Sequence, residues 1–336
     1  MSRYKRKIAV LGCGSWGGTV AQMLTDTGHD VIAWHKFPDE LDEMIRSRRH
    51  PFIEQLVFSE AMRFTGSLAA AVTGAGMVIV AVPSHIVRPI MGEIKPFLGK
   101  ETVIVNLAKG VENATLLTMS QVIGAVGAIP PERIVTLYGP SHAEEVARQM
   151  PTTLVAASRS LDTAHQVQKI FSSPVMRVYT NDDILGVELG GSLKNVIAIA
   201  AGICDGIGYG DNTKAALMTR GIAEITRLGM EMGARRDTFS GLSGVGDLIV
   251  TCLSRHSRNR FVGEAIGKGR KLDDILQEMK MVAEGVKTAE SVHQLRLKYQ
   301  VEMPISEVIY KVLFKGLEPV QAVRNLMTRD LKHEAD

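Results

Sequence analysis

The feature that most constrains this chain is a glycine-rich turn directly after its first apolar run. Residues 7–18 read Lys-Ile-Ala-Val-Leu-Gly-Cys-Gly-Ser-Trp-Gly-Gly, which places Gly12, Gly14 and Gly17 in a G-x-G-x-x-G pattern. In a strand–turn–helix unit the first glycine permits a tight turn, the second lets a pyrophosphate approach the backbone, and the third lets helix and strand pack closely. A second apolar run, Val31–Trp34, follows at the βαβ distance. The pattern therefore predicts a dinucleotide-binding turn, with a purely structural glycine turn as the alternative.

The first half of the chain alternates short, β-branched apolar runs with helix-length segments. Such runs are typical of strands in a parallel sheet that is covered on both faces. The expected strands are Ile8–Leu11, Asp30–Trp34, Met77–Val82, Thr102–Leu107, Ile134–Tyr138, Thr153–Ala157 and Arg177–Tyr179.

After Asp183 the apolar residues recur at a spacing of three to four, which predicts helices. The clearest are Ile184–Cys204, Lys214–Met232, Leu272–Met279, Glu284–Tyr299 and Val320–Met327. We therefore expect an α/β fold with two domains: an N-terminal, Rossmann-type, mostly parallel sheet domain over residues 1–183 and a C-terminal all-α domain over residues 184–336. A length of 336 residues suits two domains.

Charge and cysteine content exclude several classes of protein. There are 39 Lys and Arg residues against 36 Asp and Glu, so the net charge of +3 does not indicate a nucleic-acid partner. The three cysteines are dispersed, which favours a reducing cytoplasm over a disulfide framework. No signal peptide is apparent, and the apolar run Leu189–Cys204 is shorter than the ~20 residues of a membrane span. We expect a cytoplasmic protein without membrane insertion.

The end of the second strand bears on the choice between NAD and NADP. NAD-selective sites place Asp or Glu about 20 residues beyond the glycines, where it binds the ribose 2′-hydroxyl. Here the sequence is Trp34-His35-Lys36, with no carboxylate and with two groups that suit a 2′-phosphate. NADP is therefore expected to be tolerated, unless His35 and Lys36 are ordinary solvated residues. Asp39 and Glu40 follow shortly after, so the preference stays open.

Lys194 is the one charged residue in the run Leu189–Cys204. On a helix it shares a face with Gly190 and Gly191, so its ammonium group should lie over small residues with space beside it. A desolvated amine has a pKa lowered toward neutrality, which suits proton exchange with an alcohol and carbonyl pair. The alternative is a lysine that reaches the surface.

Two other segments carry chemistry. The segment 255–260, Arg-His-Ser-Arg-Asn-Arg, precedes a helical stretch that Ser257 is suited to cap, which predicts a phosphate seat or else a solvated basic turn. The segment 241–247, Gly-Leu-Ser-Gly-Val-Gly-Asp, is expected to aim Asp247 at a substrate hydroxyl or at Lys194, or to make Asp247 a plain helix cap.

Lys109 and the Gly139-Pro-Ser-His142 segment follow expected strands, where open α/β sheets bind ligands. A lysine there suits an anionic substrate, although many such lysines are only solvated. The histidines show no metal-ligand spacing, and no metal is expected.

Taken together, the chain resembles the bacterial NAD(P)-dependent glycerol-3-phosphate dehydrogenases over nearly its whole length. Each motif alone is weak, but eight of them in the family's order are specific. They are Gly12-Cys-Gly-Ser-Trp-Gly17, Ala81-Val-Pro-Ser-His85, Leu107-Ala-Lys-Gly110, Gly139-Pro-Ser-His-Ala-Glu-Glu145, Glu188-Leu-Gly-Gly-Ser-Leu-Lys-Asn-Val196, Gly244-Val-Gly-Asp247, Ser257-Arg-Asn-Arg260 and Ala283-Glu-Gly-Val-Lys-Thr288.

The resemblance implies roles for individual residues. Lys194 would be the proton acceptor. The implied contacts to glycerol 3-phosphate are Lys109, Gly139, Ser141, Lys194, Asp247, Ser257, Arg258 and Asn259. NAD or NADP would be held by Gly12, Gly14, Ser15, Trp16, Gly17, His35, Lys36, Lys109, Ala143, Arg258, Val282 and Glu284.

The implied reaction is reversible hydride transfer between glycerol 3-phosphate and dihydroxyacetone phosphate, which supplies glycerol 3-phosphate for phospholipid synthesis. The partner is a small-molecule substrate, with a homodimer as an option. One alternative is a β-hydroxyacid or 6-phosphogluconate-type dehydrogenase, which typically has Asn where this chain has Ala198 and a Ser-Gly-Gly loop where it has Gly139-Pro-Ser. Another is a non-catalytic NAD(P)-sensing protein, which has no use for Lys194. The roles of His142 and Glu145 stay open.

Overall fold

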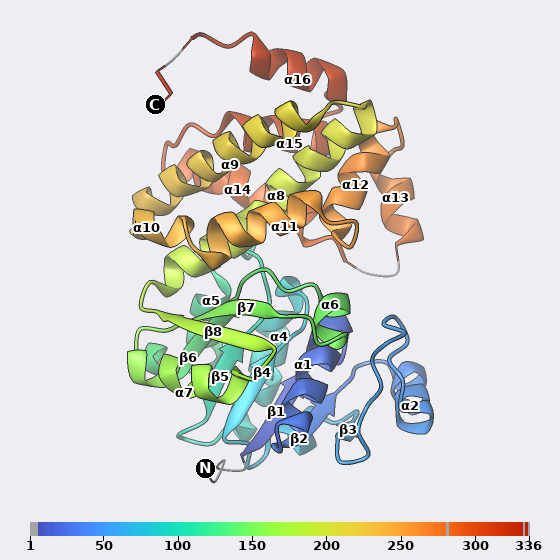
Figure 1. The fold of residues 1–336 in the computed structure, drawn as a ribbon. Helices are drawn as coiled ribbons and strands as arrows, with labels where there is room; N and C mark the ends of the chain where they lie inside the picture. Colours follow the sequence, from blue (N-terminus) through green and yellow to red (C-terminus); the bar gives the residue numbers. More distant parts are fainter. Residues whose placement is uncertain (1–5, 280–281, 332, 335–336) are drawn as a thin grey trace.

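The computed structural model describes residues 6–279, 282–331 and 333–334. A sheet part with its covering helices lies below a helical part in Figure 1, and the chain passes once from one to the other at α8. The expected α/β sheet followed by helices is confirmed. The outer limits of the two expected domains, residues 1 and 336, lie outside the described residues.

The described residues form one eight-stranded sheet in the order β3-β2-β1-β4-β5-β6-β7-β8. β7 runs antiparallel to β6, and the other neighbouring strands are parallel. The strands are β1 (Lys7–Leu11), β2 (Asp30–Trp34), β3 (Arg63–Thr65), β4 (Met77–Val80), β5 (Val103–Asn106), β6 (Ile134–Tyr138), β7 (Thr152–Ala157) and β8 (Met176–Asn181).

Helices cover both faces of the sheet and then build the helical part alone. The sheet helices are α1 (Ser15–Asp26), α2 (Pro38–Ser47), α3 (Leu68–Val72), α4 (Val87–Ile94), α5 (Met119–Gly127), α6 (Ala143–Ala147) and α7 (Leu161–Phe171). The helical part consists of α8 (Ile184–Ile207), α9 (Asp211–Glu231), α10 (Arg236–Phe239), α11 (Asp247–Leu253), α12 (Arg258–Gly267), α13 (Leu272–Glu278), α14 (Glu284–Lys298), α15 (Pro304–Phe314) and α16 (Pro319–Met327).

The alternation of side chains along each strand explains why the sheet is covered twice. Ile8 and Val10 of β1 belong to one apolar core, whereas Ala9 and Leu11 belong to the core on the other face. Both sets are fully buried, which is why the parallel strands read as continuous apolar runs. The short edge strand β3 carries no such run, and the sequence did not predict it.

The helix α8 is the centre of the helical part, and its packing depends on glycine. A Cβ atom at Gly202 would lie 2.0 Å from the carbonyl oxygen of Arg260, and one at Gly263 would lie 2.0 Å from that of Ile199. Because neither residue has a Cβ, α8 and α12 meet backbone to backbone.

By length and composition α8 could cross a bilayer, since it has 24 residues, more than the apolar run suggested. Its most apolar window is 94% buried inside the protein, however. The helix is therefore surrounded by protein, as the core helix of a globular domain is.

Candidate active site

The glycine turn has the geometry that its sequence predicts. Gly12 adopts a φ of +103°, and a Cβ there would lie 2.9 Å from the Ala81 carbonyl oxygen. A Cβ at Gly17 would lie 1.9 Å from the carbonyl oxygen of Gly12, so α1 packs directly on the turn. A Cβ at Gly14 would meet nothing within 4 Å. The backbone at Gly14 therefore faces open space at the start of α1, which fits the approach of a pyrophosphate.

The neighbouring residues fix this turn in the sheet part. Ser15 begins α1, and its carbonyl oxygen accepts a hydrogen bond from the Thr19 hydroxyl at 2.8 Å. Trp16 packs against the apolar core. Burial raises the pKa of the Cys13 thiol to about 12, so this cysteine is a neutral packing residue.

At the end of β2 the structure shows where one of the two carboxylates that left the cofactor preference open lies. A carboxylate does lie there: Glu40, in the first turn of α2, approaches His35 with its Oε2 3.0 Å from Nε2. His35 is buried and therefore committed to this contact, whereas Lys36 is exposed. The sequence distance of five residues hid the pair, because α2 turns back toward the end of β2.

A largely buried group of three charged residues joins the two parts of the molecule. The Nζ of Lys109, just beyond the end of β5, lies 2.6 Å from Oδ2 of Asp247, the first residue of α11. The other oxygen, Oδ1, lies 2.8 Å from the Nζ of Lys194 on α8. One carboxylate thus holds two amines, and we call Lys109, Lys194 and Asp247 the lysine–aspartate cluster.

The electrostatics of this cluster follow from its burial. Burial lowers the pKa of Lys194 to about 8, against the opposing attraction of Asp247. Burial alone would raise the pKa of the Asp247 carboxyl, but the charges of Lys109 and Lys194 bring it below its usual value. Asp247 is therefore ionised at neutral pH, while Lys194 is able to gain or lose a proton near physiological pH.

The glycines beside Lys194 do not leave the expected empty space. A Cβ at Gly190 would lie 3.0 Å from the carbonyl oxygen of Ser243, and one at Gly191 would lie 2.5 Å from the Tyr138 ring. The two glycines instead let α8 pack against the end of β6 and against the π-helical turn Leu242–Gly246. That turn leads directly into Asp247, so close packing aims the carboxylate at Lys194.

Two of the residues proposed for the substrate, Gly139 and Ser141, lie beside the cluster. The carbonyl oxygen of Gly139 accepts hydrogen bonds from Lys109 Nζ at 3.3 Å and from the Ser141 hydroxyl at 3.1 Å. The hydroxyl of Ser257 accepts the N–H of Arg260 at 3.2 Å, so the expected helix cap is confirmed. The rings of His142 and His256 lie 5.8 Å apart and bring the two loops together.

The start of α12 presents two neighbouring side chains in different ways. Arg258 is exposed over part of its surface, but protein surrounds its guanidinium closely enough that desolvation lowers the pKa of the group. It makes no hydrogen bond or ion pair to any other residue that the structure describes. Asn259 is buried, and its Oδ1 accepts the N–H of Gly285 at 2.9 Å. Arg258 is thus available to an anion, whereas Asn259 holds α12 against α14.

Of the remaining residues expected at the cofactor, Glu284 is the one that makes hydrogen bonds to the sheet part. Glu284, the first residue of α14, accepts the N–H of Ser84 at 3.1 Å and the Ser84 hydroxyl at 2.6 Å. Ser84 follows β4, so this contact is a second link between the sheet part and the helical part. Ala143 begins α6 and is buried, and Val282 is partly exposed.

Several polar residues at the site have no counterpart in the sequence-based prediction. The Nζ of Lys194 also donates to the Thr251 hydroxyl, one helical turn after Asp247. The spacing of four residues on a helix was the available signal. Behind the cluster, the buried carboxylate of Glu188 accepts the N–H of Ser120 at 2.8 Å and the Thr136 hydroxyl at 2.9 Å. These contacts fix α8 against the sheet.

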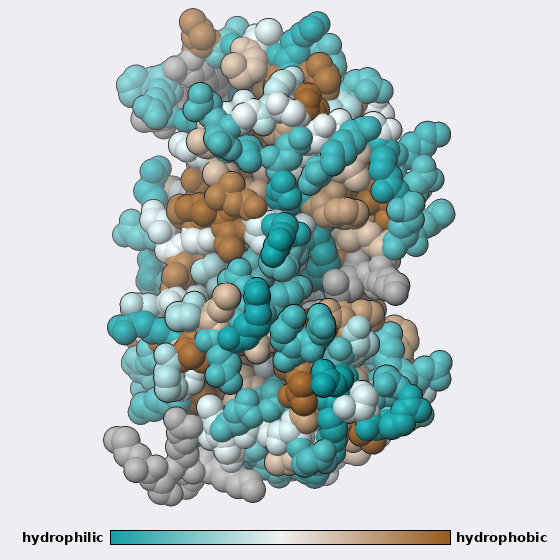
Figure 2. All heavy atoms as spheres, turned by 45° about the vertical axis from the view of Figure 1, so that its right-hand side comes forward, coloured by the Kyte–Doolittle hydropathy of each residue, from teal (hydrophilic) through white to brown (hydrophobic). Residues whose placement is uncertain are grey.

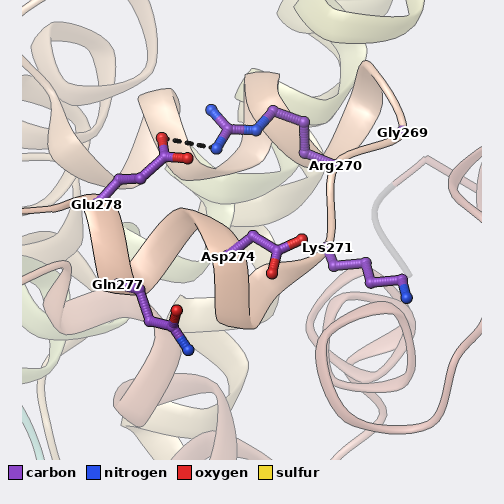
Figure 3. A pocket seen from close by; sticks show the side chains of 6 residues that line it. All are labelled: Gly269, Arg270, Lys271, Asp274, Gln277 and Glu278. Carbon is purple, nitrogen blue, oxygen red and sulfur yellow. Dashed lines mark ion pairs between the residues drawn. The ribbon is translucent and has the colours of Figure 1, made fainter.

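A shallow pocket of about 610 Å³ lies between α12 and α13, where Arg270 pairs with Glu278 at 2.7 Å (Figure 3). None of the residues that line it belongs to the lysine–aspartate cluster. Within residues 6–279, 282–331 and 333–334, no three His, Cys, Asp or Glu side chains are grouped so that they could hold a metal ion.

Comparison with known proteins settles the family. Residues 7–164 match the model for the N-terminus of NAD-dependent glycerol-3-phosphate dehydrogenase, and residues 183–324 match the model for its C-terminus. The chain belongs to this family. It is 50% identical over 331 residues to glycerol-3-phosphate dehydrogenase [NAD(P)+] of Chlorobium limicola, covering 97% of this chain and 99% of that one. The match to the same enzyme of Citrifermentans bemidjiense is 50% over 332 residues, 98% of each chain.

Solved structures agree with this assignment. The crystal structure of glycerol-3-phosphate dehydrogenase from Coxiella burnetii superposes with a TM-score of 0.93 at 35% identity, covering 97% of this chain and 100% of that one. D-mandelate dehydrogenase with NADH reaches a TM-score of 0.61 at 13% identity, over 92% of this chain and 98% of that one. The latter shares the fold alone.

Proposed function

We propose that this chain is an NAD(P)-dependent sn-glycerol-3-phosphate dehydrogenase that interconverts glycerol 3-phosphate and dihydroxyacetone phosphate. The observation that carries the proposal is the buried Lys194, whose pKa is lowered to about 8 and whose ammonium group is held by Asp247 beside the strand ends. The chain belongs to the glycerol-3-phosphate dehydrogenase family, and this membership supports the same reaction.

The glycine turn fits a dinucleotide. The positive φ of Gly12 and the open backbone at Gly14 provide the shape that a pyrophosphate needs. The start of α1 at Ser15 provides the N–H groups. The proposed cofactor site is completed by Trp16, Gly17, His35, Lys36, Lys109, Ala143, Arg258, Val282 and Glu284. When bound, the nicotinamide supplies the hydride acceptor or donor.

Lys194 is proposed to move the proton. In the oxidation direction its neutral amine takes the proton of the hydroxyl on the central carbon of glycerol 3-phosphate. In the reduction direction its ammonium group gives that proton to the carbonyl oxygen of dihydroxyacetone phosphate. A pKa of about 8 lets the same group serve both directions near neutral pH.

The other residues are proposed to bind and orient the substrate. Asp247 holds both amines in place, and Lys109 adds a positive charge at the rim of the site. The partly desolvated guanidinium of Arg258 and the Ser257 cap at the start of α12 suit a phosphate. Gly139, Ser141 and Asn259 form the remaining wall. Holding the reactants in line can contribute ~7–11 kcal/mol to the lowering of the barrier.

The proposal includes the roles of the two domains, the cellular location and the oligomeric state. We assign residues 1–183 to cofactor binding and residues 184–336 to substrate binding and proton transfer, in a cytoplasmic protein that supplies glycerol 3-phosphate for phospholipids. We also propose that the chain forms a homodimer. The exposed apolar side chains of Ile249, Leu253 and Phe261, on α11 and α12, offer a surface for this contact. On the face drawn in Figure 2, most of the surface is hydrophilic and the apolar side chains gather in a few patches.

Steady-state turnover tests the reaction. Dihydroxyacetone phosphate should be reduced by NADH or NADPH, whereas 3-hydroxy acids and 6-phosphogluconate should not be oxidised. Turnover of those acids would favour the β-hydroxyacid class. Cofactor binding without turnover of any of these compounds would favour a sensor.

A further inference from the structure

The Glu40 carboxylate occupies a defined place at the end of β2. Its Oε2 lies 3.0 Å from Nε2 of His35, the residue that follows the strand. His35 is buried, while the Glu40 side chain keeps 36% of its surface exposed. The carboxylate is therefore oriented by a fixed neighbour and remains accessible to a ligand.

This place adjoins the glycine turn. The N–H groups of Gly12 and Cys13 both donate to the carbonyl oxygen of Trp34, each at 3.1 Å. The end of β2 thus lies beside the turn proposed for the pyrophosphate. In a Rossmann-type site this is where the adenine ribose binds, and an acidic residue about 20 residues beyond the glycines reads its 2′-hydroxyl. Glu40 lies at about that distance along the chain.

The charge that acts on His35 is the carboxylate of Glu40. Burial lowers the pKa of His35 below its usual value, and the attraction of Glu40 offsets this only in part. His35 is therefore mostly neutral near pH 7. The Glu40 carboxylate therefore faces a neutral ring, and the exposed ammonium group of Lys36 is the opposing charge on the neighbouring residue. A 2′-phosphate placed here would meet a charge of its own sign.

We propose that Glu40, oriented by His35, makes this chain select NADH over NADPH. Its carboxylate accepts a hydrogen bond from the ribose 2′-hydroxyl and repels a 2′-phosphate. The inference rests on the proposed function, because it assumes that the glycine turn binds a nicotinamide dinucleotide. It adds the specificity-determining residue, which the residues taken from the family resemblance do not include. Lys36 opposes this selection and accounts for residual use of NADPH.

Substitution of Glu40 with Gln tests the assignment, because the amide keeps the shape of the side chain and removes its charge. Glu43→Gln is the matched control, since Glu43 lies on the same helix and pairs with the exposed Arg46. Dissociation constants of NADH and NADPH are measured by fluorescence without substrate, and kcat/KM is measured with each cofactor. Lys36→Ala serves as the opposing variant.

In the wild type NADH is expected to bind more tightly than NADPH. Glu40→Gln should improve the ratio of NADPH to NADH affinity about tenfold, equivalent to ~1.4 kcal/mol. Glu43→Gln should leave the ratio unchanged, and Lys36→Ala should shift it further toward NADH.

Two results would overturn the inference: a wild type that binds NADPH as tightly as NADH, or a ratio that Glu40→Gln does not change. Failure of both nucleotides to bind would instead contradict the proposed function, and the inference with it. Normal binding without turnover of dihydroxyacetone phosphate would contradict only the proposed reaction.

Discussion

The ammonium group of Lys109 and the carboxylate of Asp247 lie 2.6 Å apart, although one follows a sheet strand and the other begins a helix of the helical part. The same carboxylate holds Lys194 at 2.8 Å. The position of the proposed proton-transferring amine is thereby coupled to the relative placement of the two parts of the chain. A shift between them would alter both the site and the charge that Lys194 experiences.

Replacement of Lys194 with Ala should lower kcat by several orders of magnitude, because the other amine at Asp247, that of Lys109, lies on the opposite carboxylate oxygen and makes no hydrogen bond to Thr251. The dissociation constant for NADH should stay near the wild-type value. The exposed Lys268 provides the control, and Lys268→Ala should keep full activity. A Lys194→Ala enzyme that retains most of its turnover would remove Lys194 from the mechanism.

Asp247→Asn should shift the pH profiles of kcat/KM in both directions of the reaction. With the pKa of Lys194 at about 8, oxidation should rise with pH through 8 as the neutral amine forms, and reduction should fall over the same range. Asp247 opposes the lowering of this pKa, so its neutral isostere should move both midpoints to lower pH. Unchanged midpoints would show that another group controls the profiles.

Arg258→Ala should chiefly raise KM for the phosphorylated substrate. Loss of a charge-assisted contact to phosphate corresponds to ~1.5–3 kcal/mol, or about ten- to a hundredfold in KM. Arg255 lies on the preceding turn and is exposed, so Arg255→Ala is the matched control. A change confined to cofactor affinity would place Arg258 at the nucleotide instead.

Glu224 should make the stability of the protein fall as pH rises. Burial raises the pKa of this carboxyl to about 7, although the N–H groups of Ile305 and Ser306 donate to it. The native state therefore binds the proton more tightly than the unfolded chain. Between about pH 4.5 and pH 7 stability should fall, by roughly 3 kcal/mol in all.

Thermal melts from pH 5 to pH 8 test this expectation. The decrease in Tm should be smaller in Glu224→Gln than in the wild type, whereas the exposed Glu231→Gln should behave like the wild type. Equal slopes in all three proteins would mean that Glu224 does not titrate in this range.

Gly202→Ala should destabilise the protein by about 1–3 kcal/mol or more, because its methyl group would be forced against the backbone of α12. A Cβ at this position would lie 2.0 Å from the Arg260 carbonyl oxygen. Gly76→Ala is the control, since a Cβ there meets nothing within 4 Å. Urea unfolding of both variants measures the difference, and equal stability would mean that α8 and α12 can separate without cost.

Local sequence patterns predicted most of the sheet, because buried parallel strands are apolar on both faces. The glycine turn, the Ser257 cap and the buried Lys194 were likewise visible in the residues around them. The edge strand β3 was not, since its residues Arg63–Thr65 lack an apolar run and pair through neighbours distant in sequence.

The pairing of Asp247 with Lys194 was one of the alternatives expected from the sequence, but the other charge pairs were not. The contact of Asp247 with Lys109 spans 138 residues, and nothing in the spacing marks it. The His35–Glu40 pair is close in sequence, but only the direction of α2 brings it together. The expectation that Gly190 and Gly191 leave space beside Lys194 was wrong for a related reason. The absence of a side chain permits another group to come close, but the sequence does not show which group does so.

The backbone contact between α8 and α12 has a consequence for the range of alcohols that the enzyme can accept. The amine on α8 and the arginine at the start of α12 belong to one rigid unit, because glycines replace the side chains that would otherwise give way. If Lys194 and Arg258 act as proposed, the main-chain contact between α8 and α12 sets the distance between the reacting carbon and the phosphate of a substrate. A longer substrate would require a change in the backbone positions of α8 and α12, and substitution of side chains around the site would not suffice.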